Sequence, residues 1–155
     1  MESKVWAEIP FSPSKLNLME VKYLKGNMES PEDLLIENIV DFNSDCSMSV
    51  GFNIEQNMLR ANFSASLSSN YSEDIETGAK AYFELSFIFA YENLTEMLEF
   101  DLEGNVLKIH PNLFNAISSI SYSTSRGLLI SRLQGTSFSD FILPIIDPNE
   151  LPHNV

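Results

Sequence analysis

The sequence has few of the residues that enzymes use for nucleophilic catalysis. Its 155 residues include one cysteine and two histidines. Cys46 can form no disulfide within the chain, so the fold does not depend on one, and this cysteine usage fits a reducing compartment. Asp45 and the polar residues around Cys46 predict a raised thiol pKa, which makes Cys46 a poor nucleophile.

The two histidines, His110 and His153, are poor candidates for a catalytic base. A nucleophile needs a base within hydrogen-bond distance and usually a third group that orients the base. His110 directly precedes Pro111 at the start of a predicted helix, and His153 lies close to Val155. We interpret both as ordinary loop histidines, and we expect a protein that is not an enzyme and has no catalytic residues.

Metal and cofactor motifs are also missing. The sequence has no CxxC and no pair of histidines at helical spacing. Its acidic clusters lack the spaced oxygen ligands and the glycine of a calcium-binding loop. The six glycines are scattered, so no phosphate-binding loop is present. We therefore expect no metal and no cofactor.

Basic residues are scarce: nine Lys and Arg against 22 Asp and Glu give a net charge of −13. Such acidity argues against binding to nucleic acid or to an anionic membrane surface. It favours solubility, and it can steer positively charged partners toward the protein. The N-terminal residues MESKVWAEIPF do not resemble a signal peptide, and no apolar run is long enough to span a bilayer. We expect a cytoplasmic protein with one domain, residues 1–155.

Alternating apolar and polar residues predict a sheet of antiparallel strands with one buried face. The expected strands are residues 14–25, 47–54, 58–69 and 79–91. Only Glu55, Gln56 and Asn57 separate the second strand from the third, which predicts a hairpin. The end of the fourth strand, SFIFAY, is apolar on both faces, which indicates that its second face is covered as well. Residues 34–40 could form a strand or a crossover.

A long helix is predicted after the strands. Pro111 suits a first helical position, and Gly135 suits the left-handed residue that follows a helix. Residues 93–110, between the last strand and this helix, could form a short helix or a strand pair broken at Gly104. Apolar side chains at spacings of three and four mark one face of the helix. They are Leu113, Phe114, Ile117, Ile120, Thr124 and Leu128.

The segment after the helix, Thr136–Pro148, is unusually apolar for a loop. Pro144 and Pro148 oppose both helix and strand, and the apolar residues follow neither spacing. A loop of this kind either covers the core or binds a partner. Its apolar residues predict a surface that binds apolar polypeptide. They are Phe138, Phe141, Ile142, Leu143, Ile145 and Ile146.

From Phe83 to Leu151 the chain resembles the SecB-type export chaperones. The resemblance rests on the strand FELSFIFAYENL, on Tyr122 and Arg126 in a Tyr-x-x-x-Arg helix, and on the segment SRLQGTSFSDFILPIIDPNEL. In that segment the positions that match the family are Gly135, Thr136, Phe138, Leu143, Pro144 and Leu151. The order of the earlier elements, a first strand, a crossover and three more strands, is similar as well.

The resemblance implies an α+β fold, in which a four-stranded antiparallel sheet carries a long C-terminal helix packed on one face. It also implies an ATP-independent chaperone that assembles as a dimer of dimers and holds unfolded polypeptide clients in apolar grooves. Each groove would lie between the crossover and the loop after the helix. The residues expected to line it are Leu34, Leu35, Ile36, Ile39, Phe42, Phe138, Phe141, Leu143 and Ile145.

Two features differ from the family pattern. The family's second helix is essentially missing after Leu151, and the acidic pair of its first strand is matched at Glu20 alone, since Leu24 or Lys25 stands at the second position. In the family both features contact the export motor. A chaperone dedicated to one client, such as an antitoxin, therefore fits better than a general export factor that docks its motor through Glu20. Two further functions stay open: a hotdog-type thioester-binding enzyme and a structural or adaptor domain.

Overall fold

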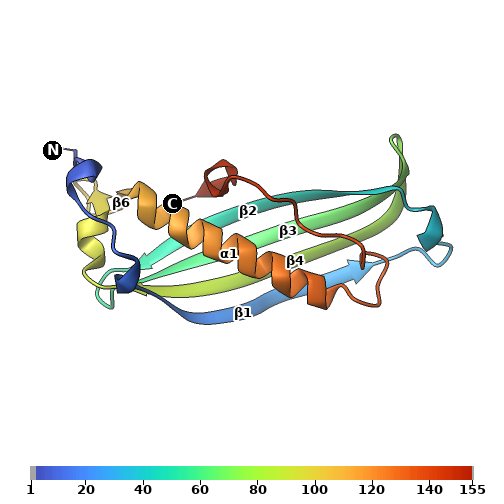
Figure 1. The fold of residues 1–155 in the computed structure, drawn as a ribbon, viewed down its shortest axis with the longest axis horizontal. Helices are drawn as coiled ribbons and strands as arrows, with labels where there is room; N and C mark the ends of the chain where they lie inside the picture. Colours follow the sequence, from blue (N-terminus) through green and yellow to red (C-terminus); the bar gives the residue numbers. More distant parts are fainter. Residues whose placement is uncertain (1–2, 155) are drawn as a thin grey trace.

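A computed structural model describes residues 3–154 and contains a twisted antiparallel sheet with four long strands (Figure 1). The strands are β1 (Leu16–Glu29), β2 (Asp41–Asn53), β3 (Met58–Ser72) and β4 (Ile75–Tyr91), in the order β1-β4-β3-β2. A short strand, β7 (His153–Asn154), pairs parallel to the outer edge of β2. The predicted fold class is confirmed.

The alternating pattern of the sequence places one face of the sheet in the core. Phe63 on β3 lies opposite Met48 on β2 and Leu85 on β4, and all three side chains are buried. The predicted strands were right in number and order but too short. β2 begins at Asp41, because its polar first half pairs with β3 through backbone hydrogen bonds that need no apolar side chains.

Helix α1 (Pro111–Arg132) packs on this face, across β3 and β4 (Figure 1). Its contact surface includes three buried serines, and small side chains of this kind allow the helix to lie close to the sheet. The predicted apolar stripe is therefore partly wrong: Leu113 and Ile117 are buried, but Ile120 and Leu128 are only half-buried. The buried serines are Ser118, Ser121 and Ser125.

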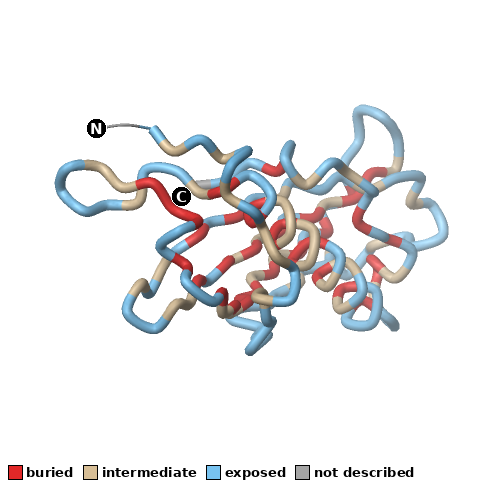
Figure 2. Tube along the Cα trace, turned by 60° about the vertical axis from the view of Figure 1, so that its left-hand side comes forward, coloured by how far each residue is buried: buried red, intermediate tan, exposed pale blue. Residues whose placement is uncertain are grey.

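After α1 the chain returns over β2 and completes the layer above the sheet (Figure 1). It passes through a short 3-10 helix, η5 (Pro148–Glu150), and joins the edge of β2 where the Met48 amide donates to the Pro152 carbonyl at 2.8 Å. Helix α1 and the returning segment thus cover β2, β3 and β4. Buried residues follow this covered region, and the outer turns are exposed (Figure 2).

The two ambiguous segments are short and irregular. The crossover, residues 30–40, contains a 3-10 turn, η3 (Ile36–Asn38), and no strand. Residues 93–110 contain both of the expected forms: a 3-10 turn, η4 (Leu94–Met97), and a small hairpin of β5 (Leu98–Phe100) and β6 (Val106–Ile109). Two further 3-10 turns precede β1: η1 (Trp6–Glu8) and η2 (Pro13–Lys15). Within residues 3–154, no helix is long and apolar enough to cross a membrane.

Candidate client-binding site

Three aromatic rings join the start of β2 to the segment after α1. The ring centroid of Phe42 lies 5.8 Å from that of Phe138 and 5.8 Å from that of Phe141. Phe138 and Phe141 are buried, while Phe42 is half-buried. The structure therefore brings together the two chain segments that were predicted to form a groove.

A tight turn after α1 directs these rings toward the sheet. Gly135 has a φ of +78°, which a side chain would strain, so the prediction of a left-handed glycine here is confirmed. The Thr136 hydroxyl donates to the Leu133 carbonyl at 2.7 Å and accepts from the Phe138 amide at 3.1 Å. Farther along, the Tyr122 hydroxyl donates to the Pro144 carbonyl at 2.5 Å. These bonds fix the segment against the helix.

The segment is extended, and its side chains point alternately inward and outward. Phe141 and Leu143 are buried, whereas Ile142 is 59% exposed and Ile145 is 91% exposed. Phe138, Phe141 and Leu143, which were expected to line the groove, are buried in this structure, where their side chains cover the part of β2 that α1 does not reach. The sequence hid this alternation, since the inward and the outward residues are both apolar.

The crossover presents apolar side chains at the same end of the sheet. Leu34 is half-buried against the core and Ile39 is half-buried, while Leu35 and Ile36 are 51% and 56% exposed. Three hydrogen bonds hold the crossover in place: the Leu35 amide donates to the Tyr71 hydroxyl (3.0 Å), the Val40 amide donates to the Asn70 carbonyl (2.9 Å), and the hydroxyls of Ser30 and Ser137 share a bond (3.3 Å).

Two exposed apolar residues at this end were missed by the sequence prediction. Val40 is 66% exposed, and Ile75, at the start of β4, is 58% exposed. Leu35, Val40 and Tyr71 line an open hollow of about 600 Å³ together with two polar residues. The sequence contained a signal for each of these two exposed residues. Val40 is the last residue of the apolar run LLIENIV, and Ile75 is an isoleucine between the carboxylates Asp74 and Glu76.

Carboxylates surround these exposed apolar side chains. Glu37 lines the same hollow, and the turn between β3 and β4 together with the start of β4 contributes three exposed acidic residues. The crossover adds two more, which are exposed as well. An apolar surface with an acidic rim favours a partner that is both apolar and basic. The acidic rim residues are Glu32, Asp33, Glu37, Glu73, Asp74 and Glu76.

Strand β1 forms an open edge of the sheet, and its face toward the α1 side is only partly covered, by Arg132 over the Tyr23 ring. Leu18, Val21 and Tyr23 lie opposite buried residues of β4 on this face, yet they are 42%, 38% and 43% exposed. Unpaired strand edges with apolar side chains readily pair with another chain. The half-buried flank of α1, with Ile120 and Leu128, lies on the same side of the sheet.

Glu20 lies on the opposite face of the sheet from the aromatic cluster, since it pairs with Ile88 of β4. Its carboxylate contacts the Lys22 ammonium at 2.8 Å, and both side chains are about half exposed. Leu24 lies at a register shift of β1, and Lys25 lies over the Tyr82 ring. Glu20 therefore belongs to a mixed-charge surface rather than to a pair of neighbouring acids.

The cysteine and the two histidines are held by burial, hydrogen bonds and ring packing. Burial, with a smaller contribution from Asp45, raises the pKa of the Cys46 thiol to about 11, which keeps it protonated near neutral pH. The His110 ring accepts from the Asn112 amide at Nδ1 (3.1 Å), so its Nε2 carries the proton and donates to the Ile9 carbonyl (2.8 Å). His153 packs on the Phe114 ring. Within residues 3–154, no group of three or more His, Cys, Asp or Glu is arranged to hold a metal.

Comparisons with known proteins identify the architecture. A scan against protein-family models finds no match, and neither does a search of curated sequences. Among solved structures, the chain is similar to the SecB-like chaperone Rv1957 of Mycobacterium tuberculosis, solved in complex with a ChAD peptide from the Rv1956 HigA1 antitoxin. The TM-score is 0.62 at 12% identity, and the match covers 86% of this chain and 91% of that one.

The resemblance seen in the sequence is confirmed at the level of the fold. All four long strands precede α1, which does not fit the hotdog alternative, where a central helix precedes most strands. The chain therefore has the fold of a SecB-like chaperone.

Proposed function

We propose that this protein is an ATP-independent chaperone, and not an enzyme, that holds non-native polypeptide in the cytoplasm. The observation that carries the proposal is the acidic-rimmed apolar surface where the crossover meets the segment after α1. Leu35, Ile36 and Val40 are at least half exposed there, and Ile142 and Ile145 are exposed on the returning segment. The SecB-like fold, and the peptide bound to a protein of that fold, support the same conclusion.

The nine predicted lining residues divide into three roles in this proposal. Leu35, Ile36 and Ile145 contact the client directly, because their side chains are already exposed. Leu34, Ile39 and Phe42 form the half-buried floor between the two segments. The buried residues Phe138, Phe141 and Leu143 anchor the segment and extend the groove when a client displaces it from β2.

The client is an apolar segment with basic residues, since the rim is acidic and the chain carries a net charge of −13. A dedicated client such as an antitoxin fits this description, and so does an exported protein. We further propose that the whole chain acts as one domain and assembles into a dimer of dimers. The open edge of β1 and the half-buried flank of α1 are the surfaces that would contact other copies.

The test is suppression of aggregation of a chemically unfolded client by Ile36→Asp and Ile145→Asp variants. Full burial of an isoleucine contributes about 1.5–3 kcal/mol, so losing one contact weakens holding by roughly tenfold to a hundredfold. Leu102→Asp is the matched control, because Leu102 is 92% exposed in the turn between β5 and β6. If all three variants hold clients as well as the wild type does, the proposed surface is wrong.

A further inference from the structure

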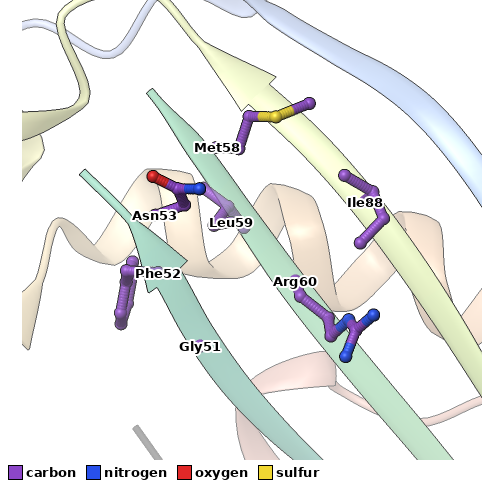
Figure 3. Close-up of a pocket in the computed structure, with 7 residues that line it drawn as sticks. All are labelled: Gly51, Phe52, Asn53, Met58, Leu59, Arg60 and Ile88. Atoms are coloured by element: carbon purple, nitrogen blue, oxygen red, sulfur yellow. The ribbon is translucent and has the colours of Figure 1, made fainter. Parts of the chain in front are cut away.

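The face of the sheet opposite α1 has a hollow that the proposed chaperone surface does not use. It measures about 370 Å³ and lies where β2, β3 and β4 run together near the turn between β2 and β3 (Figure 3). Its surrounding side chains belong to this outer face and include those of Arg60, Ile88 and Met58. Helix α1 lies behind the strands in this view (Figure 3). The residues that line the hollow are Gly51, Phe52, Asn53, Met58, Leu59, Arg60 and Ile88.

The hollow exists because β2 has a glycine, Gly51, in the row of paired residues that crosses β2, β3 and β4 at this point. Gly51 pairs with Arg60, which pairs with Ile88. A Cβ placed on Gly51 would meet no atom within 4 Å, and its φ is not in the left-handed region. Neither backbone geometry nor packing therefore requires a glycine, although glycine weakens a strand interior. Its effect here is to leave open the space beside Arg60.

Arg60 is a cation without acidic neighbours in an acidic protein. On this face its sheet neighbours are Gly51, Ile88, Met58, Asn62, Ser49, Asn53, Ser86 and Ala90, and all are uncharged. The nearest acid in its row, Glu20, lies beyond Ile88 and is paired with Lys22. Two strand spacings, roughly 10 Å, separate Glu20 from Arg60. Among the residues that the structure describes, no carboxylate is within salt-bridge distance of Arg60.

We propose that this hollow is a second polypeptide-binding site, which takes a segment with an apolar side chain next to an aspartate or glutamate. The apolar side chain enters the hollow that Gly51 leaves open and contacts Met58 and Ile88, and the carboxylate pairs with the Arg60 guanidinium. The net charge of the chain opposes an acidic partner at long range, but charges farther than about 8 Å are largely screened at physiological salt. At contact distance, the Arg60 guanidinium favours a negatively charged side chain of the partner.

A polypeptide side chain suits the hollow better than a complete small molecule. Small-molecule sites bury most of their ligand in a concave pocket, whereas this hollow is set in a sheet face and is lined by four outward side chains, those of Asn53, Met58, Arg60 and Ile88. The apolar end of β4, SFIFAY, was expected to be covered on its second face. Ile88 is the member of that run that lines the hollow. The site is separate from the client surface, which lies at the other end of the strands.

The test is binding of fluorescently labelled protein to an array of short peptides that combine each apolar residue with a neighbouring Asp, Asn or Lys. The wild type should retain Asp peptides about two- to fivefold better than their Asn and Lys counterparts, as expected for an ion pair to an exposed guanidinium. Arg60→Glu should invert the preference toward Lys peptides. Lys80→Glu is the matched control: it changes the net charge equally, and Lys80 lies on the same face of β4, opposite Glu29 of β1. This control should keep the Asp preference.

The Gly51→Leu variant tests the binding site without destabilising the fold. The Cβ of the added side chain would meet no atom within 4 Å, and the rest of the leucine would extend into the hollow, so the variant should keep its stability in urea and lose binding of the Asp peptides. Client holding should stay unchanged in the Gly51 and Arg60 variants, so the two proposals can fail independently. The same array profile for wild type and Arg60→Glu would overturn the site, as would retention of no peptide. Competition by dodecanoate without any Asp preference would assign the hollow to a small amphiphile and would equally overturn it.

Discussion

Replacing Phe138 by alanine tests whether the segment after α1 is part of the core. The Phe138 side chain is completely buried, and its ring lies 5.8 Å from that of Phe42. Truncation of a fully buried phenylalanine costs about 3–5 kcal/mol, from lost burial and from the cavity that remains. A domain of this size has a free energy of unfolding of roughly 5–15 kcal/mol, so the loss is large but leaves the protein folded under mild conditions.

The measurement is urea denaturation followed by circular dichroism and tryptophan fluorescence. The midpoint should fall by about 1–5 M, given m-values of about 1–3 kcal/mol/M, and the slope should not change. Ile145→Ala is the control, since Ile145 is 91% exposed and its truncation should change stability by no more than about 0.5 kcal/mol. A cost below about 1 kcal/mol for Phe138→Ala would refute the docking of the segment on β2.

Three further predictions concern single side chains. Because the folded pKa of Cys46 is raised to about 11 from a usual value of 9.0, the free energy of unfolding should fall as the pH rises from 9.0 to 11. Alkylation of Cys46 at pH 8 should be slow until urea unfolds the protein. Equal alkylation rates in the folded and the unfolded protein would contradict this. His110→Ala removes the bond to the Asn112 amide and should cost about 1–2 kcal/mol in urea denaturation, whereas a neutral result would mean that the cap is dispensable. Val21→Asp on the open face of β1 should lower the mass found by light scattering; an unchanged oligomer would exclude β1 from the interface.

The strands and the helix were predictable because their sequences repeat with the period of their structure. β3 alternates without interruption from Leu59 to Leu67, and Pro111 marks the first residue of α1. The first half of β2 was not predictable in this way. From Asp41 to Cys46 it is mostly polar, and only pairing with β3 makes it a strand. The apolar stripe predicted for α1 is displaced from its buried face because serines, which single-sequence patterns count as polar, face the sheet.

For the candidate site, the sequence identified the two chain segments but not which of their side chains are buried. The apolar segment after α1 and the run in the crossover were both identified, and the structure places Phe42 against Phe138 and Phe141. Their burial could not be read from the sequence, because every residue from Phe141 to Ile146 is apolar or proline. Which of them point inward depends on the path of the chain over β2. The hollow beside Gly51 depends on strand register, which places Arg60 next to a missing side chain.

The scarcity of ion pairs has a consequence for how the protein responds to salt. Lys22 and Glu20 form a salt bridge, but within residues 3–154 most of the acidic side chains have no such partner. Their mutual repulsion favours the expanded chain, and added salt reduces it because the screening length shortens to about 8 Å at physiological ionic strength. Salt should therefore stabilise the folded protein while it weakens the attraction of basic clients. Folding and holding thus respond to ionic strength in opposite directions, and the net charge of −13 sets the size of both effects.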